Sequence, residues 1–143
     1  MMLPGCKGVE PADFRDGDII SLEVLNSLSI PSHRVKVVLD ADGNLERELE
    51  DRGEQPKTSK HRVGADDIKR VRDLIRSIDW HHVSKDVVIG LDGTSARVEY
   101  QGSKYSVWTP RHDTEKRGLT NFLRLENEFF RLAGFNDPDT PQQ

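Results

Sequence analysis

The sequence has little cysteine, few aromatic residues and no long apolar run, and each shortage narrows what the chain can be. Its 143 residues include one cysteine, so no disulfide can form within the chain. No apolar stretch approaches the ~20 residues of a transmembrane helix. Aromatic residues make up 6% and charged residues 32%, so we expect one domain with a modest core and a highly charged surface.

Sequence motifs for catalysis and metal binding are also missing. The chain has no H-E-x-x-H, C-x-x-C or G-x-S-x-G motif, and its glycines are scattered at turns. Among five histidines only His81 and His82 are adjacent, and neighbouring residues on a helix or strand point to different sides. The loop Asp40–Asn44 lacks the glycine and glutamate spacing of an EF-hand. We therefore expect a protein that is not an enzyme and holds no metal or cofactor.

Charge is unevenly distributed around a net value of −4. Seven acidic residues lie between Asp40 and Glu54, and seven lysines or arginines lie between Lys57 and Arg76. The basic stretch lacks interleaved aromatic residues that would stack on bases. We therefore expect a solvated basic face there and no nucleic-acid partner.

Apolar periodicity predicts an α+β fold, with an antiparallel sheet of about five or six strands and two amphipathic helices in the order βββ-α-βββ-α. The predicted strands are Ile19–Leu25, Arg34–Leu39, Asn44–Glu50, Val87–Leu91, Thr94–Gln101 and Lys104–Thr109. The predicted helices are Asp66–Ile78 and Leu119–Ala133. The Asp92-Gly93 and Gly102-Ser103 pairs are expected at hairpin turns. Residues 14–135 form the domain, between a loose segment at 1–13 and a frayed tail at 136–143.

Three carboxylates stand out in the predicted strand N-L-E-R-E-L-E-D. Glu46, Glu48 and Glu50 lie on one side of it, because side chains alternate along a strand. A three-residue loop Ala41–Gly43, with a left-handed Gly43, would pair the apolar residues of the two strands.

That register also sets Lys36 opposite Glu48 and Arg34 opposite Glu50. The row then becomes a mixed-charge face on which Glu46 is the least compensated.

A few other side chains are candidates for binding. Trp80, His81 and His82 follow the first predicted helix; an exposed Trp80 would anchor a partner, and a buried one would be part of the core. Trp108, Arg111 and His112 could line a cleft for a small ligand. Glu126 interrupts the apolar side of the second predicted helix, which places it at the rim of the core.

The single cysteine lies in the sequence Leu3-Pro4-Gly5-Cys6. This sequence resembles the end of a bacterial lipoprotein signal, in which a small residue precedes the lipid-bearing cysteine. The basic and apolar regions that come first in such a signal are missing here. As written, the chain is expected in the cytoplasm; if the true start lies upstream, Cys6 would be lipidated and the protein anchored in the periplasm.

The stretch D-G-T-S-A-R-V-E-Y-Q-G-S-K-Y-S-V-W-T-P, with the later F-F-R-L-A-G, resembles the C-terminal half of small uncharacterised bacterial α+β domains. These domains share a D-G-T hairpin, a strand ending in W-x-P and a closing helix. The resemblance implies a bacterial α+β domain and brings no catalytic residues.

These observations lead to three expectations about function. The first is a non-catalytic protein-binding module, such as an inhibitor or immunity protein of a bacterial toxin, whose acidic row meets a basic partner. The alternatives are an accessory domain of a cell-envelope lipoprotein and a small-ligand-binding domain.

Overall fold

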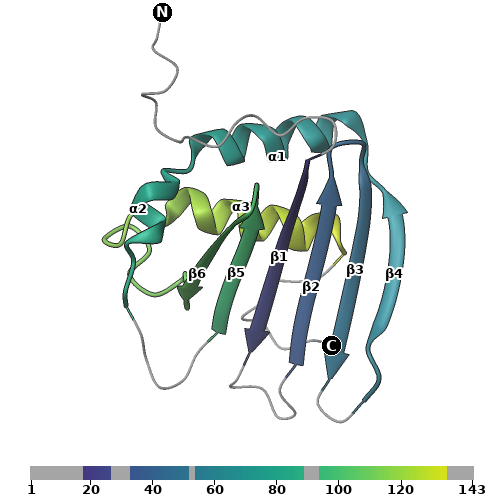
Figure 1. Cartoon of the computed structure of the whole chain (residues 1–143), viewed down its shortest axis with the longest axis horizontal. Helices are drawn as coiled ribbons and strands as arrows, with labels where there is room; N and C mark the ends of the chain where they lie inside the picture. Colours follow the sequence, from purple (N-terminus) through teal and green to yellow (C-terminus); the bar gives the residue numbers. More distant parts are fainter. Residues whose placement is uncertain (1–17, 27–32, 52–53, 89–93, 135–143) are drawn as a thin grey trace, which may run out of the picture.

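Six strands pair in the order β4-β3-β2-β1-β5-β6, and every neighbouring pair is antiparallel. The computed structural model describes residues 18–26, 33–51, 54–88 and 94–134 of the chain, and helices lie against the sheet (Figure 1). The strands are β1 Ile19–Asn26, β2 His33–Asp40, β3 Asn44–Asp51, β4 Lys57–Arg62, β5 Thr94–Tyr100 and β6 Ser103–Trp108. The helices are α1 Ala65–Ser77, α2 Trp80–Ser84 and α3 Thr120–Leu132. The predicted α+β class is confirmed.

The core lies between the helices and one face of the sheet. Helix α1 buries Ile68, Val71 and Ile75, as its three- and four-residue spacing predicts. Helix α3 contributes Phe122 and Phe129, and Gly134, with φ of +81°, follows it at the predicted stop. No helix in the described ranges is both long and apolar enough to cross a bilayer.

The register between β2 and β3 is the one that the charge pattern predicts. Leu39 pairs with Leu45, and Arg34 pairs with Glu50. The loop holds three residues and ends on Gly43, whose φ is +99°. A Cβ at Gly43 would lie 2.8 Å from the Val63 carbonyl oxygen, so this close approach requires glycine.

Strand β4 and helix α2 were not predicted. Strand β4 has the sequence K-T-S-K-H-R, and all six of its residues are exposed. The segment therefore lacks the alternation of apolar and polar residues that predicts a half-buried strand. It forms because its backbone pairs with β3. Helix α2 has only five residues, and it begins where the Asp79 carboxylate accepts a hydrogen bond from the His82 backbone N–H at 3.0 Å.

The predicted strand Val87–Leu91 is wrong for the two residues of it that the structure describes. Val87 and Val88 lie outside any strand, and both are exposed. Strand β5, which it would have joined, already has β1 on one edge and β6 on the other. Residues 89–91 and the predicted Asp92-Gly93 turn lie outside the described residues.

The second predicted turn is one residue out of place. Tyr100 pairs with Ser103, so the turn is Gln101-Gly102, with φ values of 53° and 81°. Positive φ at both central residues is the type I′ pattern of tight hairpins.

Candidate protein-binding face

Side-chain alternation gives the sheet a second face, opposite the core. On β1, Ile20, Leu22 and Val24 are buried, while Ile19 and Leu25 are 56% and 47% exposed. We call the side that carries Ile19 and Leu25 the outer face. Its acidic residues are Glu23, Asp40, Glu46, Glu48, Glu50 and Glu99. Its basic residues are Arg34, Lys36, Lys60, Arg62, Arg97 and Lys104.

Arg34 is the centre of the charge pattern on the outer face. Its guanidinium lies 3.1 Å from Glu50 and 3.8 Å from Glu48, and it also donates a hydrogen bond to Glu23. Arg97 approaches Glu23 from the other side at 3.7 Å. Glu48 and Glu50 of β3 therefore each lie beside a cation.

Glu46 was expected to be the least compensated of the three glutamates, and the unpredicted strand β4 changes its surroundings. In the strand register, Lys60 of β4 lies opposite Glu46, and Val38 of β2 lies opposite it on the other side. The outer face thus carries six carboxylates and six cations in alternation, with no net sign. This surface therefore does not favour a partner that is attracted by net negative charge alone.

A hollow of about 400 Å³ opens beside Glu46. Its lining is Ile19, Val38, Asp40, Asn44, Leu45, Glu46, Lys60, His61 and Arg62. The hollow therefore combines apolar side chains with both signs of charge, which suits an amphipathic side chain or a small polar molecule.

Asp40 is the fixed anion at this hollow. Partial burial would raise its pKa, but hydrogen bonds from the Asn44 amide and from the Asn44 and Asp42 backbone N–H groups hold the pKa below its ordinary value. Arg62 donates to the Asn44 side-chain oxygen at 2.8 Å and to the Asp42 carbonyl at 2.7 Å. The polar rim is therefore held in place from two strands.

The residues after α1 divide between core and surface. Trp80 is only 4% exposed and packs against Tyr100, Tyr105 and Phe122, so it is not available as an anchor for a partner. His81 and His82 are exposed. The His82 ring forms a hydrogen bond at 2.9 Å with the Arg117 carbonyl, which ties α2 to the loop before α3.

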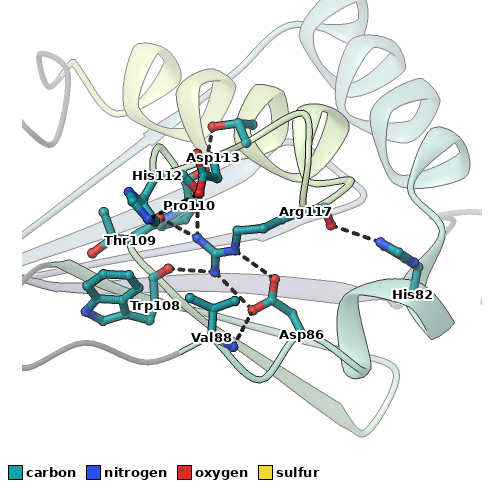
Figure 2. Close-up of polar contacts among 10 residues, drawn as sticks. His82, Asp86, Val88, Trp108, Thr109, Pro110, His112, Asp113 and Arg117 are labelled. Atoms are coloured by element: carbon teal, nitrogen blue, oxygen red, sulfur yellow. Dashed lines mark hydrogen bonds and ion pairs between the residues drawn. The ribbon is translucent and has the colours of Figure 1, made fainter.

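The region around Trp108, where a ligand cleft was predicted, is organised by an arginine that the sequence did not single out. Figure 2 shows the Arg117 side chain between Asp86 and the backbone of residues 108–112. Its five N–H groups make two bonds to the Asp86 carboxylate, both 3.0 Å, and one each to three carbonyls. Those carbonyls belong to Trp108, Thr109 and His112. We call this set the Arg117 cluster.

The Arg117 cluster is a structural feature, because every donor of its arginine is already used. The Arg117 and Asp86 side chains are 7% and 4% exposed. Burial would raise the pKa of Asp86, but the Arg117 hydrogen bonds outweigh it and hold that pKa below its ordinary value. No sequence motif marks this pair, since only folding brings the two segments together.

The three residues predicted to line that cleft lie around the cluster. The Trp108 and His112 rings meet edge to face with centroids 5.5 Å apart, and Arg111 donates to the Asn127 side chain at 2.7 Å.

Glu126 was expected at the rim of the core; it is 2% exposed and therefore lies inside it. Cys6 lies outside the described residues, so its lipidation stays a prediction.

No group of three or more histidine, cysteine or acidic side chains suited to a metal ion occurs in the part of the chain that the structure describes. No family model matches the chain, and comparison with curated proteins gives no match. The outer face is therefore argued from its own geometry.

Proposed function

We infer that the protein is a protein-binding module that uses the outer face of its sheet. The observation that carries this inference is the hollow beside Ile19, set among twelve charged side chains on a face that the helices leave uncovered (Figure 1). Interfaces concentrate their binding energy where a side chain fills a pocket and a polar rim excludes water. Here the pocket is the hollow lined by Ile19 and Val38, and the polar rim consists of the charged side chains around it.

The partner should carry both signs of charge. Charges across an interface give specificity and raise the association rate, and like charges placed together are penalised. A partner surface with one apolar projection for the hollow and alternating acidic and basic side chains would match the face. An inhibitor or immunity protein, which covers the working surface of a second protein, is the form of binding module we propose.

The test is capture of partners with matched surface variants of the full chain. Ile19→Asp places a carboxylate in the hollow, and Arg97→Glu reverses one charge of the outer face. Lys69→Glu is the control, because Lys69 is exposed on α1, away from this face. We expect a protein encoded beside the gene to bind the unaltered chain and the Lys69 variant, but not the first two.

Two results would count against this function. Equal capture by all variants would place binding elsewhere on the molecule. No binding to any neighbouring gene product, and no relief of its toxicity on co-expression, would remove the inhibitor proposal.

A second candidate, binding of a small ligand, is favoured by the size of the hollow, which falls in the range of ligand sites of roughly 300–1,000 Å³. A ligand at about a hundred times its dissociation constant would add about 2.7 kcal/mol of stability. Ile19→Trp would fill the hollow and remove that thermal shift. Retention of the shift in this variant would exclude the hollow as the site.

A further inference from the structure

Among the strands that the structure describes, β4 lies at an edge of the sheet. Its backbone groups can be divided into a set that faces β3 and a set that faces outward. The Val63 backbone N–H donates to the Gly43 carbonyl at 2.8 Å, so odd-numbered residues at this end bond toward β3. Since bonding direction alternates in an antiparallel pair, Thr58, Lys60 and Arg62 direct their N–H and C=O groups away from the sheet. These groups form a template for a further strand.

The side chains of β4 restrict which strand can use that template. The strand carries Lys57, Lys60, His61 and Arg62, and it has no acidic or aliphatic residue. The Lys57 and Lys60 side chains are exposed. A second copy of β4 would set cation against cation, which is destabilising, so the edge disfavours pairing with itself.

The inner edge of β4 shows what kind of strand it accepts. Its neighbour there is β3, with glutamates at alternate positions, and Glu46 pairs with Lys60 while Glu48 pairs with Thr58. A strand on the outer edge with the same alternation would place its carboxylates beside Lys60 and Arg62 from the opposite side. Backbone bonds would supply affinity, and the alternate carboxylates would supply selectivity.

We propose that the β4 edge binds an extended acidic segment of a partner protein as a seventh, antiparallel or parallel, strand. The segment carries glutamate or aspartate at alternate positions. The edge shares Lys60 and Arg62 with the lining of the hollow. Its outward backbone groups are separate from the hollow, so the proposal goes beyond binding through the outer face, and Thr58→Pro and Ile19→Asp test the two separately.

Hydrogen exchange gives the most direct test. The probe is a labelled peptide of alternating glutamate and threonine, added to the full chain. Binding as a strand should slow exchange of the backbone amides of Thr58, Lys60 and Arg62, while the odd-numbered amides, already bonded to β3, change little. Binding without this alternation would overturn the proposal.

Two pairs of variants test the backbone and charge contributions in turn. Thr58→Pro removes an outward N–H while leaving the bonds to β3, and Thr58→Val keeps that N–H. Lys60→Gln removes a cation at the edge, and Lys104→Gln removes one on β6, at the other side of the sheet. We expect Thr58→Pro to abolish peptide binding, Lys60→Gln to weaken it by ~2- to 5-fold, and both controls to bind normally.

Further controls distinguish strand addition from binding at the outer face and from simple attraction between charges. Ile19→Asp should leave peptide binding intact, so failure of the outer-face proposal would not affect this result. A peptide of alternating lysine and threonine should not bind. Equal binding of the lysine peptide would overturn strand addition. Strand addition would also be overturned if an oligonucleotide displaced the acidic peptide and Thr58→Pro had no effect on peptide binding.

Discussion

Arg117 donates two hydrogen bonds to Asp86, across 31 residues of chain, and with its other three N–H groups it fixes the backbone that leads into α3. Removing one partner of a buried ion pair leaves the other charge uncompensated. We expect Arg117→Met to lower the free energy of unfolding by about 3–5 kcal/mol, measured by urea denaturation.

Two variants accompany the Arg117 measurement. Arg117→Lys keeps the charge but loses the planar fork, so we expect a smaller loss. Arg124→Met changes an exposed arginine of α3 and should alter the free energy of unfolding by less than about 0.5 kcal/mol. Equal losses at Arg117 and Arg124 would contradict a structural role for the Arg117 cluster.

Acid should destabilise the protein through a ring of charges between α1 and α3. Asp67 and Glu128 are bridged by Arg70 and Arg131, with contacts of 2.8, 3.1 and 2.9 Å and a further close contact between Arg131 and Glu128. Burial would raise the pKa of Glu128, but hydrogen bonds from Arg131 and Arg70 hold it below its ordinary value. The Arg131 hydrogen bond is the main cause of the lowered pKa of Asp67.

The sign of the pH effect follows from those lowered pKa values. A carboxyl group with a lower pKa in the folded state stabilises fully above its unfolded pKa, and the stabilisation is lost as pH falls through the folded pKa. The melting temperature should therefore fall with pH below about 4.5. Glu128→Gln should lower stability at neutral pH and flatten this acid dependence; an unchanged pH profile would exclude the ring as its source.

Gly118 should tolerate alanine less well than Gly102. Both have positive φ, at +72° and +81°, but a Cβ at Gly118 would lie 2.5 Å from the His82 ring, whereas nothing lies within 4 Å of one at Gly102. Gly102→Ala should therefore cost only the backbone strain, ~1–2 kcal/mol. Gly118→Ala should cost more, and the excess should shrink in a His82→Ala background; an additive double mutant would contradict the contact.

Arg34 should contribute to stability in a salt-dependent way. It is the shared partner of Glu23, Glu48 and Glu50 and is 28% exposed. Arg34→Gln should lower the free energy of unfolding by about 1 kcal/mol at low salt, and the difference should narrow as salt is added. Lys36→Gln, on the same strand, is the control; a salt-independent loss at Arg34 would indicate packing rather than charge.

Local patterns in the sequence were sufficient for most elements of this fold. The three- and four-residue spacing of Ile68, Val71 and Ile75 predicts α1, and the alternation in β1, β2 and β3 predicts a half-buried sheet. The side chains of β2 and β3 even select the loop length, because the three-residue loop is the one that sets Leu39 opposite Leu45 and basic residues opposite glutamates. These features depend on neighbours in sequence or on one hairpin, which the sequence displays directly.

Features that depend on distant segments were not predictable in this way. Strand β4 has no apolar alternation, and only the exposed edge of β3 makes it a strand. That strand then decides the surroundings of Glu46 and creates the open cationic edge. In the same way, the burial of Trp80 requires β5, β6 and α3 to come together.

By itself, therefore, the sequence determined the fold class, the apolar faces of α1 and α3, and the register of the β2–β3 hairpin. Short-range periodicity and turn chemistry are enough for these. Only the tertiary structure decided which surfaces remain open. Sheet order placed β4 at an edge, core packing buried Trp80, and Arg117 joined the backbone after β6 to Asp86. Each outcome depends on contacts between residues far apart in the chain.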